Sequence, residues 1–212
     1  IDACNRANAF FIDWFFDPVF KGSYPQFMVD WFAEKGATLN IQDGDMETIN
    51  QPIDFIGINY YTGSVGRYKE NEGLFDHERV DTGYQKTDIG WNIYPEGFYK
   101  VLTHISKTYG DVPIYITENG SCYNDEPENG QVKDDRRTDY LRQHLVSLHR
   151  AMENGVNIKG YLTWSLLDNF EWAEGYSMRF GIVHVNYRTL ERTKKDSFYW
   201  YKQTIANNFF EV

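Results

Sequence analysis

Three short apolar segments, separated by amphipathic helical patterns, constrain the fold of this 212-residue chain more than any other feature. They occupy residues 53–61, 113–117 and 158–164. Apolar runs of this length bounded by Pro, Gly or Asn are typical of strands that are buried on both faces. Strands that alternate with helices indicate parallel βα units, because parallel neighbours need a long crossover connection.

The helices are predicted from apolar residues that recur at spacings of three and four. They cover residues 24–36, 95–109, 135–154 and 194–209, and a further helix opens the chain. We expect this first helix to end at Asp17-Pro18, since proline disfavours a helical residue before it. The polar, Gly-rich residues 62–92 are predicted to form a long loop that can hold a hairpin.

Each predicted strand ends in polar or aromatic residues. Asn59, Tyr60 and Tyr61 close the first strand, Glu118 the second and Trp164 the third. Both open α/β sheets and (β/α)8 barrels place ligand sites at these carboxyl ends. The long loops after the strands favour the barrel, and no Gly-rich phosphate loop supports a nucleotide-binding sheet.

Glu118 is the first candidate functional residue. It follows the strand Pro113–Thr117 directly and precedes Asn119-Gly120. A carboxylate at the mouth of an apolar core is costly to desolvate, which favours a functional role. The alternative is that Glu118 caps the next segment or pairs with a surface cation.

Composition excludes several classes of partner. The net charge is -10, from 31 acidic and 21 basic residues, which argues against nucleic acid or an anionic membrane as partner. Aromatic residues make up 17% of the chain. Tyr and Trp suit hydroxyl-rich ligands, because the ring covers C–H patches while its polar tip makes a hydrogen bond. An aromatic-rich core is the alternative explanation.

Cofactor and metal sites are not predicted. Cys4 and Cys122 are expected to be free thiols, and the five histidines show no metal-binding spacing. No apolar run has transmembrane length, and no leader is recognisable, so we expect a cytoplasmic location. The chain opens directly into a helical pattern, as a segment of a longer protein would.

Several segments, taken in order, resemble retaining β-glycosidases of the β-glucosidase type, glycoside hydrolase family 1. The resemblance extends over nearly the whole chain. Its main segments are residues 14–18, 22–25, 55–62, 90–97, 116–120, 163–172 and 179–181. The resemblance implies a (β/α)8 TIM barrel, of which residues 1–212 supply roughly the last three βα units as the C-terminal part of a single domain.

The resemblance also implies roles for individual residues. Glu118 matches the catalytic nucleophile, and Tyr61 is similar to the tyrosine that steers it by a hydrogen bond. Asn59 resembles a polar residue near the catalytic pair, with a strand or turn cap as the alternative. Trp91 resembles a residue that lines the aglycone side.

The remaining matches concern the non-reducing sugar. Glu171 and Trp172 match the pair that holds its O4 and O6 hydroxyls, although Glu171 could also be a solvated loop acid. Trp164 resembles the platform beneath the sugar and Phe180 a wall near O6, with a core position as the alternative for both. Because a carboxylate at 171 would repel a phosphate, the ligand implied is a neutral β-glucoside, β-galactoside or short oligosaccharide.

One departure from the family pattern limits what this chain can do. Retaining glycosidases need a second carboxylic acid about 5–5.5 Å from the nucleophile. The family carries it in an Asn-Glu-Pro segment, which this sequence lacks; Glu126-Pro127 follows Asp125 and is not a substitute. We therefore expect the chain to be inactive alone and to need a complementary N-terminal part of the barrel.

Two rival functions stay open from the sequence. A non-catalytic carbohydrate-binding or scaffold fragment could retain the aromatic pocket without turnover. A small open-sheet α/β hydrolase would need a GxSxG nucleophile elbow, and the sequence contains none.

Overall fold

The computed structural model describes residues 3–208, and the chain divides into two compact units. One unit comprises the residues up to Asp54 together with Ser64–Thr82. The other comprises Phe55–Gly63 and the residues from Gly83 onward. Every candidate site residue belongs to the second unit. The assignment of the whole chain to a single barrel domain stays a prediction.

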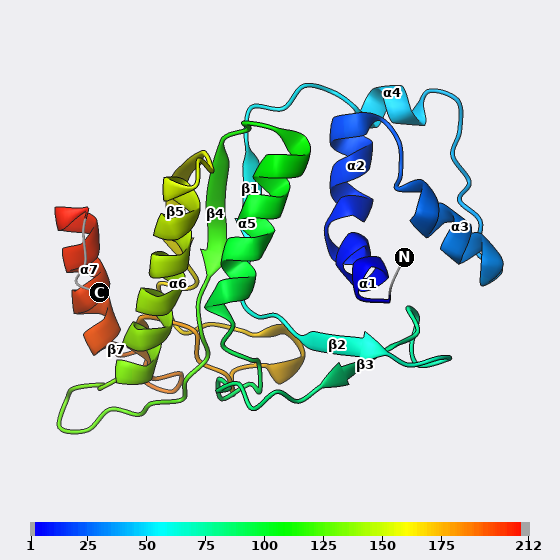
Figure 1. Ribbon diagram of the computed structural model, residues 1–212. Helices are drawn as coiled ribbons and strands as arrows, with labels where there is room; N and C mark the ends of the chain where they lie inside the picture. The colour runs from blue at the N-terminus through cyan, green and yellow to red at the C-terminus, as the bar shows by residue number, and fades with distance from the viewer. Residues whose placement is uncertain (1–2, 209–212) are drawn as a thin grey trace. The chain divides into compact units, whose positions relative to one another are not determined.

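A three-stranded parallel sheet forms the centre of the second unit (Figure 1). Its strands are β1 (Ile56–Asn59), β4 (Ile114–Asn119) and β5 (Ile158–Thr163), in the order β1-β4-β5. All three lie within the segments that the sequence predicts as strands or extend them by at most two residues. The carboxyl ends of β1, β4 and β5 therefore meet at one edge, as expected for parallel βα units.

Helices cover one face of this sheet. Figure 1 shows α5 (Pro95–Tyr109) and α6 (Asp135–Glu153) side by side across it, and α7 (Asp196–Asn207) follows α6. Their predicted ranges were correct to within two residues. The apolar side chains buried on the helices and on alternate strand positions include Phe98, Leu102, Ile105, Leu141, Ile56, Ile58, Ile114 and Ile116. This apolar layer holds the strands against the helices.

The opposite face of the sheet is open to solvent among the described residues. Gly57 and Thr117 are exposed, and Leu162 on β5 is 53% exposed despite its apolar side chain. Tyr115 stands opposite Gly57 on one side and Gly160 on the other, and a Cβ at Gly160 would come within 2.8 Å of its ring. Gly160 thus makes room for the Tyr115 side chain, whereas a Cβ at Gly57 would come within 3.1 Å of the Thr117 side chain on the same helix-free face. In a (β/α)8 barrel this face lines the interior.

The segment after β5 contains structure that the sequence did not predict. A 3₁₀ turn spans Trp172–Glu174, and β6 (Val183–Val185) pairs antiparallel with β7 (Arg192–Lys194). The two strands have three residues each, too short for an alternating pattern to be recognised. This hairpin returns the chain toward α7.

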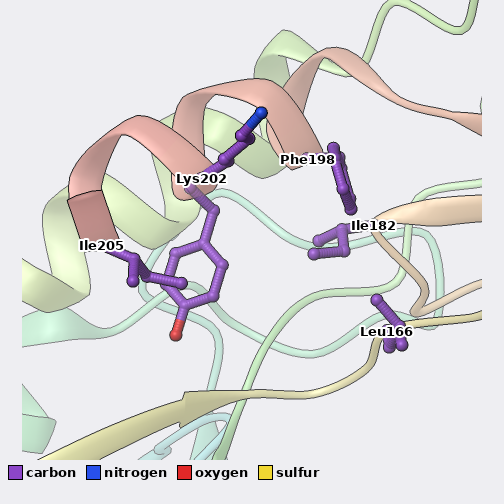
Figure 2. A pocket seen from close by; sticks show the side chains of 6 residues that line it. Leu166, Ile182, Phe198, Lys202 and Ile205 are labelled. Carbon is purple, nitrogen blue, oxygen red and sulfur yellow. The ribbon is translucent and has the colours of Figure 1, made fainter.

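An apolar pocket lies between α7 and the segments that follow β5 (Figure 2). Figure 2 shows Leu166 and Ile182 near Phe198, with Ile205 about two turns further along α7. The full lining is Leu166, Ile182, Phe198, Tyr201, Lys202 and Ile205. Leu166 stands three residues beyond the end of β5, which has β4 as its only strand neighbour among the described residues.

The first unit is mainly helical. Its elements are α1 (Ala3–Phe11), α2 (Asp13–Lys21), α3 (Gln26–Glu34), α4 (Asp45–Ile49) and the antiparallel hairpin of β2 (Val65–Tyr68) and β3 (His77–Val80). Ala9, Met28 and Phe75 form its core. The predicted helix at 24–36 and the hairpin within 62–92 are confirmed, whereas the short helix α4 was not predicted.

The predicted helix end at Asp17-Pro18 is wrong. The helical path instead breaks at Ile12, and Pro18 lies inside α2. Pro18 is the sixth residue of α2, where it lacks only its own N–H donor, and the helix continues to Lys21; the N–H of Gly22, the C-cap, donates to the Pro18 carbonyl at 3.2 Å. Gly22 has φ +68°, the left-handed conformation common just beyond helix ends.

Two further observations concern the cysteines and the question of a membrane-spanning helix. Cys4 and Cys122 are both free thiols. Among the helices of residues 3–208, none combines the length and the apolar character that crossing a membrane requires.

Candidate active site

Glu118 and Tyr61 form the centre of the site. The Tyr61 hydroxyl donates to Oε2 of Glu118 at 2.6 Å, although the two residues are 57 positions apart. The pairing of β1 with β4 brings them together, because Asn59 stands opposite Glu118 in the register and the Tyr60 N–H donates to the Glu118 carbonyl at 2.9 Å. Glu118 is half-buried, so its carboxylate is accessible from the strand ends.

The environment of Tyr61 keeps it a hydrogen-bond donor. Burial, and then the hydrogen bond to the negatively charged Glu118, raise the pKa of the Tyr61 hydroxyl well above its ordinary value. Both effects oppose ionisation of the phenol. Tyr61 therefore presents an O–H group to the carboxylate over the whole physiological pH range.

Asn59 lies at the same edge, on the last position of β1. Its side-chain oxygen accepts a 2.6 Å hydrogen bond from the Thr117 hydroxyl, and the residue is exposed. Thr117 directly precedes Glu118. Asn59 is thus placed beside the carboxylate by β1–β4 pairing, on the helix-free side of the sheet.

Aromatic side chains surround the Tyr61 ring. Its centroid lies 5.5 Å from that of Trp91 and 6.0 Å from that of Phe180, and Trp91 and Phe180 are 5.8 Å apart. Phe180 is buried, at 3% exposure, and packs against both other rings. Trp91 is half-buried and offers the more accessible surface.

The loop after β5 carries the other predicted site residues. Trp164 directly follows β5, and its N–H donates to the Asn119 carbonyl at 2.9 Å, so it stands next to the end of β4. Burial, and then the negative charges of Glu118 and Glu174, raise the pKa of Glu171. This coupling places Glu171 within electrostatic range of Glu118. Trp172, by contrast, is 83% exposed.

A buried ionic cluster fixes this loop. Oδ1 of Asp168 accepts from the Gly181 N–H at 2.9 Å and from Nζ of Lys195 at 3.1 Å. Oδ2 accepts from Nη1 of Arg179 at 2.8 Å and from the Val185 N–H at 3.2 Å. Four donors on one fully buried carboxylate offset its desolvation and tie both sides of the loop together.

Arg137 of α6 connects the loops after β4 and β5. Its guanidinium is buried, forms an ion pair with Asp134 at 2.9 Å, and donates to the carbonyls of Ser121, Tyr123, Arg179 and Phe180. The carbonyls lie on both loops that border the site. Arg137 therefore holds the loop that follows Glu118 against the loop that carries Glu171 and Phe180.

Sequence reasoning missed these supporting residues. Asp168 and Arg179 stand inside segments that resemble the family, but neither was assigned a role. Lys195 and Arg137 are charged residues in helical or loop patterns, where solvent exposure is the ordinary expectation. Only the tertiary contacts reveal that all four are paired, with Asp168, Lys195 and Arg137 buried and Arg179 partly buried.

No metal centre emerges from the described part of the chain. Residues 3–208 contain no group of three or more His, Cys, Asp or Glu side chains arranged to hold a metal ion. The site instead combines an accessible carboxylate, a phenol that donates to it, a second carboxylate and aromatic surfaces. Such a set can bind hydroxyl groups and can supply a carboxylate nucleophile.

Comparison with known proteins identifies the family. The sequence profile of the family described as glycosyl hydrolase family 1 matches residues 1–210. β-Glucosidase A of Acetivibrio thermocellus is 47% identical over 200 residues, which cover 93% of this chain and 45% of that protein. The chain thus spans about half the length of the curated relatives it matches.

Comparison with solved structures supports the same family. The crystal structure of a β-glucosidase from Exiguobacterium marinum superposes with a TM-score of 0.91 at 44% identity, covering 98% of this chain and 48% of that one. The β-glucosidase of Thermotoga maritima in complex with deoxynojirimycin gives a TM-score of 0.86 at 41% identity, covering 94% and 44%. The predicted (β/α)8 fold is confirmed, with this chain as a part of the barrel. The chain belongs to glycosyl hydrolase family 1 and is similar over its length to the C-terminal part of β-glucosidases.

Proposed function

We propose that this chain supplies the nucleophile and part of the sugar pocket of a retaining β-glycosidase that hydrolyses terminal, non-phosphorylated β-D-glucosides. The observation that carries the proposal is the 2.6 Å hydrogen bond from Tyr61 to Oε2 of Glu118 at the carboxyl ends of parallel strands. It leaves the other oxygen of Glu118 for attack. The half-buried Trp91 ring beside Tyr61 suits a sugar ligand, and the buried Phe180 packs against both rings.

The reaction proceeds in two steps. Glu118 attacks the anomeric carbon and forms a covalent glycosyl ester while the aglycone oxygen leaves and takes a proton. Water then attacks the same carbon, loses a proton and releases Glu118 as a carboxylate. Tyr61 orients the carboxylate in both steps, because its hydroxyl remains a donor throughout.

The proton donor is the missing component. We propose that it resides on a complementary N-terminal part of the barrel, since the sequence holds no Asn-Glu-Pro segment. The exposed Leu162 and the edge of β5, which is unpaired among residues 3–208, support such a partner, because an isolated three-stranded sheet leaves edges and apolar side chains in water. Alone, the chain is expected to be inactive, as it lacks acid assistance and a closed site.

Glu171 and Trp172 are proposed to hold the sugar's O4 and O6 hydroxyls, with Trp164 as its platform. The negative charges of Glu171 and Glu118 act on the same region, which disfavours a dianionic phosphate on the sugar. The complete enzyme should therefore cleave an aryl β-glucoside and leave the corresponding 6-phospho-β-glucoside uncut.

A trapping experiment tests the proposal. The chain is co-expressed with the part of Acetivibrio thermocellus β-glucosidase A that precedes the matched region, and the complex is treated with an activated 2-deoxy-2-fluoro-β-glucoside. Peptide mass spectrometry should find the sugar ester on Glu118. The Glu118→Gln variant should remain unlabelled, whereas Glu126→Gln, a change of an acid whose side chain is 66% exposed, should be labelled like the parent.

The outcome separates the two surviving functions. Sugar binding that is reversible and never labels Glu118, in a complex that has assembled, would assign the chain to the non-catalytic carbohydrate-binding class. Turnover by the purified chain alone, at rates ordinary for glycosidases, would contradict the proposed need for a partner.

A further inference from the structure

Asn119, the last residue of β4, has a fully buried and hydrogen-bonded side chain beside the site. It has 0% exposure. Its Nδ2 donates to the Tyr60 carbonyl at 2.6 Å and to the Tyr140 hydroxyl at 3.2 Å, and its Oδ1 accepts from the Tyr161 hydroxyl at 2.6 Å. Both the nitrogen and the oxygen of the amide therefore have partners, which come from the residue that follows β1, from β5 and from α6.

Tyr140 extends this network to the residue that contacts Glu118. It is buried on α6, and its hydroxyl accepts from Asn119 while donating to the Tyr61 carbonyl at 2.8 Å. Its ring stacks on His144 with centroids 3.9 Å apart, which fixes the direction of the hydroxyl. The carbonyls of Tyr60 and Tyr61 both lie beyond the end of β1, where strand pairing no longer holds them.

The backbone of Asn119 also holds the carboxyl end of β5. Its carbonyl accepts from the Trp164 N–H at 2.9 Å and from the Thr163 hydroxyl at 3.1 Å. One residue next to Glu118 thus joins the carboxyl ends of β1, β4 and β5. A fully satisfied polar network in a low-dielectric interior is rigid, because loosening any member leaves buried polar groups unpaired.

We infer that Asn119 and Tyr140 are positioning residues, which hold the Tyr61 backbone so that its phenol stays in hydrogen-bonding contact with Glu118. The inference rests on the proposed nucleophilic role of Glu118. The substitution Tyr140→Phe would keep the aromatic ring, but it would remove the hydroxyl that donates to the Tyr61 carbonyl. Misplacements of the order of an ångström near reacting groups cost about a hundredfold in rate. The hydrogen bond from Tyr140 to the Tyr61 carbonyl therefore affects the reaction rate by keeping the Tyr61 phenol in place.

The first test uses the 212-residue chain itself and the Tyr140→Phe variant. Tyrosines are labelled with ¹³C at Cζ, and the exchange rate of the Tyr61 hydroxyl proton is read in mixed H2O and D2O, with Tyr61→Phe to assign the signal. Tyr140→Phe should speed that exchange at least about tenfold, since loss of the anchor loosens the bond to Glu118. Tyr201→Phe is the matched control: it removes a hydroxyl that donates to the Tyr161 carbonyl at 3.2 Å and touches neither Asn119 nor Tyr61.

The second test uses the co-expressed complex and the fluoro-glucoside. Tyr140→Phe should slow labelling of Glu118 at least about tenfold while deoxynojirimycin binds with unchanged affinity, and Tyr201→Phe should alter neither quantity. Exchange of the Tyr61 proton at the parent rate in Tyr140→Phe would overturn the inference whatever the labelling shows. Absence of labelling in the parent would refute the proposed function alone, because the exchange measurement still decides the positioning role.

Discussion

The hydroxyl of Tyr61 lies 2.6 Å from Oε2 of Glu118, across the junction of β1 and β4. The contact depends on parallel pairing, which sets Asn59 opposite Glu118 and brings the following Tyr61 to the carboxylate. Two residues from different βα units thereby form one chemical unit. The stability and reactivity of this junction can be tested in several independent ways.

Tyr61→Phe tests the contribution of the phenol. A hydrogen bond to a charged group contributes about 1.5–3 kcal/mol, so its loss should slow Glu118 labelling in the co-expressed complex by about 10- to 100-fold. Tyr60→Phe is the control, because its hydroxyl donates to the Tyr94 carbonyl at 2.7 Å and not to Glu118. Equal labelling rates in both variants would show that the phenol does not act on the nucleophile.

Gly120→Ala tests the close approach of the β4 and β5 ends. A Cβ at Gly120 would lie 1.8 Å from the Trp164 carbonyl oxygen, a contact that only backbone movement can relieve. We expect a loss of at least about 3 kcal/mol in unfolding free energy, the upper range for overpacking. Gly130→Ala, in open space at φ +80°, should cost only about 1 kcal/mol from backbone strain. Urea unfolding of the two variants gives the comparison, and similar losses would exclude the predicted clash.

Asp168→Asn tests the buried ionic cluster. The change removes the charge that pairs with Lys195 and Arg179 inside the protein, and uncompensated buried charge costs about 3–5 kcal/mol. Glu126→Gln removes an exposed partner of the same arginine, 3.5 Å away, and should cost less than about 1 kcal/mol. Thermal unfolding followed by circular dichroism distinguishes the two, and a small effect at Asp168 would mean that the cluster contributes little to stability.

Because His144 is buried, we expect the free energy of unfolding to depend on pH. Burial lowers its pKa from 6.5 to about 4, while its Nδ1 lies 2.8 Å from the Tyr140 carbonyl. Between these two values the unfolded chain binds a proton that the folded chain does not, so stability falls as the pH falls from about 6.5 to about 4. The full loss attributable to this residue is about 3 kcal/mol.

Urea titrations across that pH range measure the effect. His144→Gln should flatten the decline, because glutamine does not titrate. His149→Gln, on the same helix but with a side chain that is 64% exposed, should leave the slope unchanged. A parent chain whose unfolding free energy stays constant between pH 6.5 and pH 4 would show that the pKa of His144 is not lowered by folding.

Local sequence patterns predicted most of the secondary structure. The apolar runs around Ile56, Ile116 and Ile158 identified the strands, and periodic apolar residues gave α5, α6 and α7 nearly to the residue. Pro18 was misjudged, because the helical path breaks at Ile12 instead, and α2 continues past Pro18 to Lys21 although proline lacks an N–H donor. The β6–β7 hairpin was missed, since three-residue strands carry too little pattern.

The sequence by itself determined the strands, the helices and, through the resemblance of short motifs, the residues to place at the site. Only the tertiary structure decided how those residues are held. Asn119, Tyr140, Asp168 and Lys195 carry no local sign of burial, because burial and hydrogen-bond satisfaction depend on partners that are distant in the chain. Strand pairing and helix packing bring these partners together, and the cost of unpaired buried polar groups then fixes one arrangement.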